Sequence, residues 1–370
     1  MANSAKTTPA LGAHLPSLTG ARFLAALLVV LYHAGAWVEE VPTAPAGPFR
    51  FGYVGVSFFF VLSGFVLTWT WRPGERTRSF YLRRFARVWP LHALTTCVAG
   101  CLALSGLAIT ARLEALPAHL LVVQSWWLDS SWIFQWNSPS WSLACEAFFY
   151  AVFPVLVAFH GRPRVLLGIA LGWLICWGVL VLEVRPDLTH FLYTFPAYRA
   201  GEFAVGVAAG MYLRAGRRLP VGLAAGATVA VGGYALIWLG DRLAGGFFGR
   251  EQWASQLVVL GGFALVILTA AQHDLDGRPS PLGAPWMVKL GQWSFALYLV
   301  HQLVFVFGVP VRSNLGMGAR YVVILALSVV AVGVSAAAYE WFERPIEKRI
   351  RSWGSQRESV LAAARERSVD

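Results

Sequence analysis

Residues 18–37 read LTGARFLAALLVVLYHAGAW, and this stretch decides the class of fold. Twenty helical residues at about 1.5 Å each span about 30 Å, the thickness of the hydrocarbon core of a bilayer. Similar apolar runs recur as far as Tyr339, and 57% of the 370 residues are hydrophobic while 13% are charged. Soluble domains carry roughly 25% charged residues. The composition therefore predicts an all-α, polytopic membrane protein.

The apolar runs predict ten transmembrane helices within one integral domain of residues 17–345. They are Leu18–Trp37, Val54–Trp71, Val88–Ile109, Trp141–His160, Val165–Glu183, His190–Leu213, Val221–Gly240, Trp253–Ala271, Met287–Gly308 and Ala319–Trp341. For the tryptophan-rich stretch Pro117–Trp132 three predictions stay open: an eleventh transmembrane helix, a re-entrant segment or an interfacial segment. Residues 1–16 and 346–370 are predicted to be an N-terminal segment and a basic tail.

The basic residues predict the orientation of the chain. If the N-terminus is inside, most of the 30 Lys and Arg residues fall in cytoplasmic loops and in the tail, as the positive-inside rule requires. We therefore expect both termini in the cytoplasm and a multi-pass location in the inner (plasma) membrane. The net charge of +11 follows from this asymmetry and from contacts with anionic lipid, so no nucleic-acid partner is predicted.

Ionisable residues inside a membrane span are costly and mark functional sites. Arg22 and His33 are 11 residues apart, which is three helical turns plus roughly 20° and about 16 Å of rise. They are expected to face the same way, with Arg22 toward the cytoplasm and His33 in the outer half of the membrane. The alternatives are that Arg22 reaches the headgroups and that His33 makes an interhelical hydrogen bond.

The second predicted span and the segment after it carry further polar residues. Ser63 and Gly64 would let a helix or a ligand approach closely, and helix packing is the commoner use of such residues. Arg84, Arg87 and Pro90 form the pattern RxxRxxP at the cytoplasmic boundary. These arginines would bind lipid headgroups or the phosphates of a cosubstrate, which guanidinium groups match well.

The fourth and sixth spans each contain a carboxylate. Ser142, Glu146 and Tyr150 recur every fourth residue and so share a helix face, which points the Glu146 carboxylate inward. Arg199 and Glu202 are three residues apart, and an ion pair between them is the favoured interpretation.

The last two spans add polar groups at opposite depths. Tyr298 and His301 share a face of the ninth span, with His301 at a depth similar to that of His33. Glu340 and Glu343 precede Pro345, a residue that stops helices, and a salt-bridged helix end is the favoured interpretation at that cytoplasmic surface.

Taken in order, these motifs resemble the acyltransferase-3 family of membrane O-acyltransferases. The resemblance is carried by Arg22-x10-His33, FFFVLSGF around Ser63, RxxRxxP, WSLACEAFFY around Glu146, GQWSFALYLVH around His301 and the sequence ERP at Glu343–Pro345. It implies that the arginine and the histidine of the first helix are required for activity. It also implies an acyl donor such as acetyl-CoA, and hydroxyl acceptors on cell-envelope glycans or on glycosylated natural products such as macrolides.

The resulting hypothesis is an O-acyltransferase with acyl-CoA as a cosubstrate and no bound cofactor or metal. We predict His33, Glu146 and Arg22 as catalytic residues, and Arg84, Arg87, Ser63, Tyr298, His301, Ser142 and Arg199 as substrate or cosubstrate contacts. In this hypothesis His33 is the general base, oriented by Glu146, and His301 or Tyr298 stabilises the oxyanion. His33 as a nucleophile is the rival mechanism.

A transporter or flippase of a glycan or metabolite intermediate is the alternative function, because ionisable residues inside a membrane also line transport pathways. The sequence lacks two matching halves with interrupted helices, the usual sign of an inverted-repeat carrier. The expected partners are acyl-CoA, a hydroxylated glycan or glycoside, and the lipid bilayer.

Overall fold

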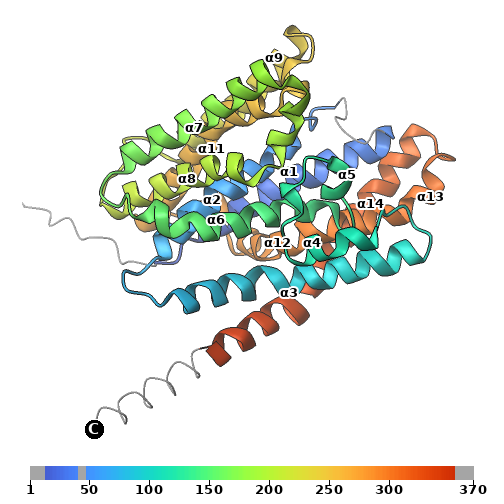
Figure 1. The fold of residues 1–370 in the computed structure, drawn as a ribbon, viewed down its shortest axis with the longest axis horizontal. Coiled ribbons are helices and arrows are strands. Elements are labelled where there is room, and N and C mark those ends of the chain that lie inside the picture. Colours follow the sequence, from blue (N-terminus) through green and yellow to red (C-terminus); the bar gives the residue numbers. More distant parts are fainter. Residues whose placement is uncertain (1–12, 41–46, 355–370) are drawn as a thin grey trace, which may run out of the picture.

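The computed structural model describes residues 13–40 and 47–354, and this part of the chain is almost entirely helical and contains no strand. The long helices are α1 (Pro16–Glu39), α2 (Gly55–Thr70), α3 (Thr77–Leu104), α6 (Trp141–Val157), α7 (Pro163–Val184), α8 (Pro196–Arg214), α9 (Leu223–Leu243), α11 (Gln252–Leu275), α12 (Pro285–Phe305) and α14 (Met317–Ala338). They form one bundle (Figure 1). The prediction of an all-α polytopic membrane protein is confirmed.

Within residues 13–40 and 47–354, twelve short helical elements accompany the long helices. They are η1 (Gly52–Val54), η2 (Leu113–Ala115), α4 (Leu116–Leu120), η3 (Gln124–Trp126), α5 (Ser130–Ile133), η4 (Ser138–Ser140), η5 (Pro186–Tyr193), α10 (Phe247–Arg250), η6 (Pro281–Gly283), η7 (Val306–Gly308), α13 (Val309–Arg312) and η8 (Tyr339–Glu343).

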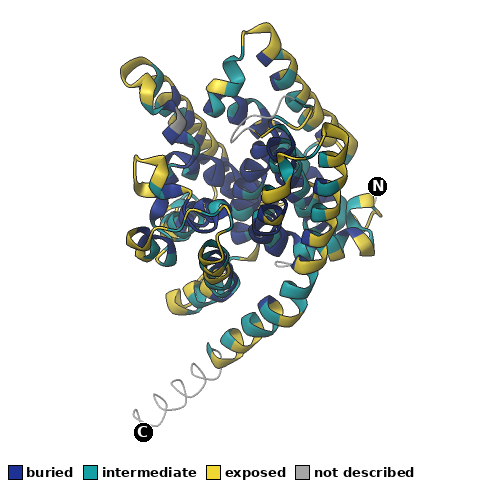
Figure 2. Ribbon diagram, turned by 90° about the vertical axis from the view of Figure 1, so that its right-hand side faces the viewer, coloured by how far each residue is buried: buried dark blue, intermediate teal, exposed yellow. Residues whose placement is uncertain are grey.

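The bundle has a buried interior and an apolar perimeter. Most residues of α2 and α8 are buried, whereas α7, α9 and α14 expose large apolar side chains such as Val231 and Leu325. Figure 2 shows the buried residues gathered at the centre and the exposed ones around the outside. In water such a surface would drive aggregation, and in a bilayer it contacts lipid. The long helices therefore surround a protein-filled centre in which polar groups are shielded from lipid.

Close backbone contact holds the centre together. A Cβ atom added at Gly206 of α8 would lie 1.9 Å from the carbonyl oxygen of Val61 in α2, so only glycine fits this crossing. Small residues allow the same close approach of helices in membranes generally. The prediction that the Ser63–Gly64 region serves helix packing is confirmed for Gly64, which lies against the backbone of Phe203 in α8.

Each of the ten predicted spans coincides with a long helix. Within the described residues, nine helices are long and apolar enough to cross a membrane. The exception is α8, which is 19 residues long and is less apolar because it carries Arg199 and Glu202. Its position in the buried centre allows this composition.

The stretch Pro117–Trp132 contains no membrane-spanning helix. Its short helices and the turn after them fold back onto the bundle. The side chain of His92 in α3 lies 2.8 Å from the carbonyl oxygen of His119, and the amide of Asn137 donates to the carbonyl of Leu299 at 3.0 Å. Helix α6 therefore begins beside the middle of α12 rather than at the membrane surface.

The C-terminal part of the last helix differs from the prediction. The sequence predicts that Pro345 stops the helix, but the structure continues it as one 38-residue helix, Met317–Gly354. The wide π-turn η8 precedes Pro345, and such a turn relieves the clash that proline otherwise makes with the preceding turn. Residues 344–354 extend away from the bundle (Figure 1). The predicted tail from residue 346 is thus helical to Gly354, and its remainder lies outside the described residues.

Candidate active site

The packing of α1 on α12 brings two histidines together. A Cβ atom added at Gly291 would lie 1.8 Å from the carbonyl oxygen of Thr19, so the two helices touch without an intervening side chain. About three turns further along, His33 of α1 meets His301 of α12, with ring centroids 5.0 Å apart. The sequence predicts similar depths for these residues, and the structure places them in contact.

Hydrogen bonds define the roles of the four imidazole nitrogens. His301 Nδ1 lies 3.0 Å from the carbonyl oxygen of Leu297, and His301 Nε2 lies 3.1 Å from His33 Nδ1, which is also 3.0 Å from the carbonyl oxygen of Val29. A carbonyl oxygen only accepts, so Nδ1 of neutral His301 carries the proton and Nε2 accepts from His33. His33 is then protonated on Nδ1, and its Nε2 keeps a free lone pair.

A large cationic cavity of about 630 Å³ opens at the other end of α1. Its charged lining consists of six arginines and two glutamates: Arg22, Arg72, Arg83, Arg84, Arg87, Arg351, Glu75 and Glu347. They come from α1, from the α2–α3 connection, from the first turns of α3 and from the C-terminal helix. An excess of guanidinium groups in a cavity fits a ligand with several phosphate charges.

Two of these guanidinium groups are partly buried and have no acidic partner. Within the described chain, Arg22 and Arg84 form no ion pair, and the Arg84 Nε atom is buried without a hydrogen-bond partner. Arg87, in contrast, pairs with Glu343 and lies 3.7 Å from Glu347. Unpaired buried cations are costly, so Arg22 and Arg84 are the stronger candidates for ligand contacts.

The cationic cavity continues inward through two smaller ones. A middle cavity of about 130 Å³ shares Arg22, Arg84 and Arg87 with it, and an inner cavity of about 50 Å³ shares Arg22 and Glu146 with the middle one. We call the three cavities together the passage. The inner cavity ends at Tyr298, whose ring lies 6.3 Å from that of His301. The passage thus leads from the cationic cavity, which has room for a ligand with several phosphates, toward the histidine pair.

Most of the predicted site residues meet along this route. Seven of them line the passage, namely Arg22, Ser63, Arg84, Arg87, Ser142, Glu146 and Tyr298. His33 and His301 form the pair beyond its inner end. Only Arg199 lies elsewhere.

Glu146 does not orient His33, in contrast to the role that the sequence predicts for it. Its carboxylate accepts a hydrogen bond from the Tyr150 hydroxyl at 2.9 Å and lines the passage beside Arg22. The imidazole of His33 has His301 as its partner instead. The reason is depth, because α6 begins beside the middle of α12 and Glu146 lies correspondingly closer to the cytoplasmic end.

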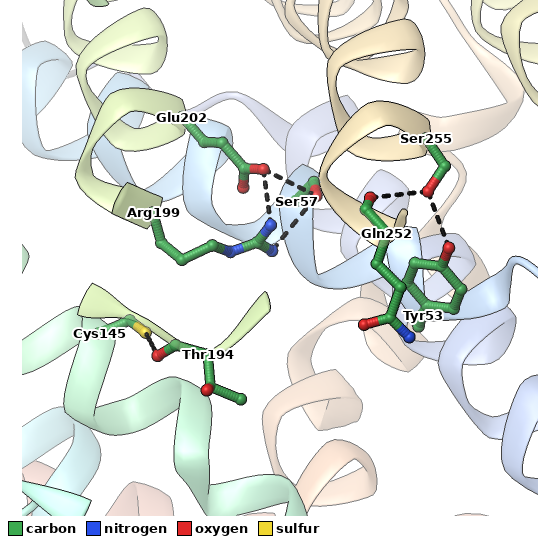
Figure 3. Close-up of polar contacts among 8 residues, drawn as sticks. All are labelled: Tyr53, Ser57, Cys145, Thr194, Arg199, Glu202, Gln252 and Ser255. Carbon is green, nitrogen blue, oxygen red and sulfur yellow. Dashed lines mark hydrogen bonds and ion pairs between the residues drawn. The ribbon is translucent and has the colours of Figure 1, made fainter. Parts of the chain in front are cut away.

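Arg199 is a structural residue in this fold. Its side chain is fully buried, pairs with Glu202 at 2.8 Å and donates to Ser57 Oγ at 3.3 Å (Figure 3). Its guanidinium also lies over the ring of Phe60, 4.8 Å from the centroid. The predicted ion pair with Glu202 is confirmed, whereas a contact of Arg199 with substrate is not supported, because Phe60 separates it from the inner cavity.

Tyr298 is also committed to a protein partner. Its hydroxyl donates to the carbonyl oxygen of Pro139 at 2.9 Å, so its proton does not point toward a developing oxyanion. The neighbouring Ser142 hydroxyl donates to the same carbonyl at 3.3 Å. Both side chains shape the inner cavity, and neither is a free donor.

The C-terminal helix also contributes to the mouth of the passage, which the sequence does not predict. Tyr339, Glu347 and Arg351 line the cationic cavity. The predicted salt bridges are confirmed, since Glu340 pairs with Lys289 and Arg344 and Glu343 pairs with Arg87, but they lie within a continuous helix and not at its end. The signal was present in the sequence YEWFERPIEKR, but the expected helix stop at Pro345 hid its continuation.

Fold and site together define an integral-membrane protein with an arginine-rich internal passage that leads toward a histidine pair. The chain belongs to the acyltransferase-3 family: residues 15–340 match the family described as an acyltransferase domain. It is therefore an O-acyltransferase, and the prediction of an enzyme is confirmed.

Curated relatives agree with this assignment. The chain is 31% identical over 354 residues to acyltransferase MdmB of Streptomyces mycarofaciens, covering 86% of this chain and 89% of that protein. It is 31% identical over 321 residues to exopolysaccharide production protein ExoZ of Rhizobium meliloti (strain 1021), covering 82% and 92%. O-acetyltransferase OatA of Staphylococcus aureus is 24% identical over 374 residues, covering 91% of this chain and 58% of that protein. No solved structure matches the chain.

Proposed function

We propose that this enzyme moves a short acyl group, such as acetyl, from acyl-CoA to a hydroxyl of a carbohydrate-containing acceptor at the inner (plasma) membrane. The acceptor is a cell-envelope glycan or a glycosylated natural product such as a macrolide. The observation that carries the proposal is the passage, which leads from unpaired arginines toward the histidine pair, where His33 keeps a free Nε2 lone pair.

The donor end of the passage suits coenzyme A. Arg22 and Arg84 have guanidinium groups without acidic partners, and Arg87 is shared with Glu343 and Glu347. Guanidinium groups bind phosphate with two parallel hydrogen bonds, so the nucleotide phosphates would lie here. The pantetheine arm would follow the middle cavity inward. The inner cavity of about 50 Å³ matches fewer than two water molecules at roughly 30 Å³ each, which favours a short acyl chain.

The acyl transfer itself uses His33 as a general base. Its Nε2 takes the proton of the acceptor hydroxyl while the hydroxyl oxygen attacks the thioester carbon. The carbon–sulfur bond then breaks, and the protonated His33 returns the proton to the departing thiolate, giving CoA as the free thiol. The products are the O-acyl ester and CoA, and no other reactant is needed.

His301 supports this cycle as a positioning residue. By accepting a hydrogen bond from His33 Nδ1 it selects the tautomer whose Nε2 is unprotonated. When His33 becomes an imidazolium, the same bond becomes charge-assisted and stronger. His301 thus takes the part that the sequence predicts for Glu146.

The relatives support the class of acceptor. One is named as an exopolysaccharide production protein and another as an O-acetyltransferase. The alternative function, a carrier, would have to release its ligand chemically unchanged on the opposite side of the membrane. Formation of an acylated product therefore separates the two functions.

The test is acceptor-dependent release of the CoA thiol by the purified full chain in lipid nanodiscs. With acetyl-CoA and a panel of methyl glycosides, we expect thiol release that rises with at least one glycoside, together with a product heavier by one acetyl group. Absence of both with every donor and acceptor would refute the proposal. Rapid quench with labelled acetyl-CoA and no acceptor separates the two mechanisms, since only the nucleophilic route leaves label on the protein.

A further inference from the structure

A separate cavity of about 180 Å³, which we call the side cavity, lies against α12 on the predicted outer side. Its polar and aromatic lining consists of Thr110, Phe134, Trp136, Asn137, Ser138 and Gln302, and the rest is apolar. It shares no residue with the passage. Gln302 directly follows His301, so the side cavity borders the turn of α12 that carries His301.

The side cavity contains hydrogen-bonding groups that the described chain leaves unused. Asn137 is fully buried and donates to the carbonyl of Leu299 at 3.0 Å, but its Oδ1 atom is buried without a hydrogen-bond partner. Asn137 presents no surface to the cavity, whereas Gln302 is partly exposed and its side-chain amide has no partner in the described chain. Polar groups in native proteins nearly always have a partner, so the free amide of Gln302 is the group that indicates a ligand.

The backbone at this site is held in a strained conformation. Trp136 has φ 58°, the left-handed region that bulky residues rarely adopt. It is kept there by a backbone hydrogen bond to the carbonyl of Thr110 at 2.7 Å and by a bond from its indole nitrogen to the carbonyl of Arg112 at 3.0 Å. Strain that the surroundings maintain in this way is concentrated at binding sites. Here it places the Asn137 side chain next to α12.

Size and charge identify the class of ligand. Among the residues that the structure describes, no charged one lines the side cavity, which disfavours a phosphate or a lipid headgroup. A volume of 180 Å³ equals about six waters at roughly 30 Å³ each, enough for one ring and well below the roughly 300–1,000 Å³ of sites for drug-sized ligands. Amide groups beside aromatic rings suit a neutral ring with many hydroxyl groups.

We infer that the side cavity is a subsite for one pyranose ring of the acceptor, held by the side-chain amide of Gln302. This inference rests on the proposed function for its identification of the ring as part of the acceptor. The binding of the sugar itself does not depend on the transfer reaction and can be measured without acyl-CoA.

The first test is saturation-transfer difference NMR on the full chain in nanodiscs, without donor. The probes are the methyl glycosides of glucose, galactose, mannose and rhamnose, with cyclohexylmethanol as a ring that carries a single hydroxyl. We expect transfer to the ring protons of at least one glycoside, weaker transfer to cyclohexylmethanol, and at least a fivefold loss in Gln302→Leu. Asn314→Leu, which changes an exposed residue, is the matched control and should behave as the wild type.

Gln302→Leu removes no hydrogen bond between described residues, so the fold should persist. Ser138→Val, which changes another residue that lines the side cavity, is a second variant. In the transfer assay Gln302→Leu should raise the acceptor KM at least tenfold while leaving the acyl-CoA KM unchanged. Equal NMR transfer in wild type and both variants would overturn the subsite. Sugar binding without any transfer by the wild type would instead refute the proposed function, and with it the assignment of the ring to an acceptor.

Discussion

The two ends of α1 are built on opposite principles. At Arg22 the helix faces a cavity of about 630 Å³ whose cations outnumber its carboxylates, and the Arg22 guanidinium has no acidic partner within the described chain. At His33 the helix packs tightly on α12, and the imidazole is held by hydrogen bonds to Val29 and His301. The open end is suited to receive a charged ligand, and the closed end is suited to hold one proton in a fixed place. Substitutions near Arg22 should therefore change donor binding, and substitutions near His33 should change the rate of acyl transfer.

The largest effect is expected from His33→Ala. Loss of a general base typically lowers the rate by about 10²–10⁴-fold, so kcat should fall by that factor while acyl-CoA binding remains. The assay is thiol release, combined with equilibrium binding of labelled acetyl-CoA and a size-exclusion profile to check the fold. Near-normal turnover would remove His33 from the mechanism.

His301→Leu should have the next largest effect. It deletes the acceptor for His33 Nδ1, and hydrogen bonds to charged groups are worth roughly 1.5–3 kcal/mol, or about 10- to 100-fold in kcat. His301→Gln offers a carbonyl oxygen in its place and should recover part of the rate. The acyl-CoA KM should stay constant in both variants, and a change in this KM equal to that in kcat would mean that the two ends of α1 do not act separately.

Arg22→Gln should shift binding and leave chemistry less affected. A lost charge-assisted contact of roughly 1.5–3 kcal/mol would raise the acyl-CoA KM by about 10- to 100-fold. The effect should disappear when acyl-pantetheine, which lacks the nucleotide phosphates, is the donor. If Arg22→Gln impaired both donors equally, Arg22 would act on the thioester instead of the phosphates.

The smallest effect is expected from Glu347→Gln. Its carboxylate lies 3.7 Å from Arg87 in a partly exposed pair, and such pairs contribute about 0–1 kcal/mol. Removing it leaves Arg87 with Glu343 as its only carboxylate and takes away the partner of Arg351, so both arginines become more available to phosphate and the acyl-CoA KM should fall by about two- to threefold. The control is Glu114→Gln, because Glu114 is exposed and does not line the passage. An increase in KM would show that Glu347 itself contacts the donor.

Features that depend on helical periodicity are predicted well by the sequence. The spacing of 11 residues predicts that Arg22 and His33 share one face, and both lie toward α12, Arg22 through the cavity it shares with Gln292 and His33 through His301. Each predicted span also corresponds to a helix, because long apolar runs leave the chain few alternatives in a bilayer. Local spacing alone determines these features.

Features that depend on packing between distant segments could not be predicted. The depth of Glu146 is set by the short helices before it, which fold back onto α12 and carry no periodic signal. The partner of Arg87 is Glu343, more than 250 residues away, and the continuation of that helix depends on a π-turn before Pro345. For Arg199 the spacing predicts the ion pair with Glu202, but not the bond to Ser57 from another helix or the position behind Phe60 that keeps it from the passage.

The length of the last helix has a consequence for how the donor is captured. A helix of 38 residues is about 57 Å long at 1.5 Å per residue, nearly twice the roughly 30 Å of hydrocarbon. Its far end, with Glu347 and Arg351, must therefore stand in water while it still walls the mouth of the passage. A nucleotide held there would stay hydrated as its thioester arm entered the protein. Donor capture would then follow the aqueous concentration and ionic strength of that compartment, and would be insensitive to lateral diffusion within the bilayer.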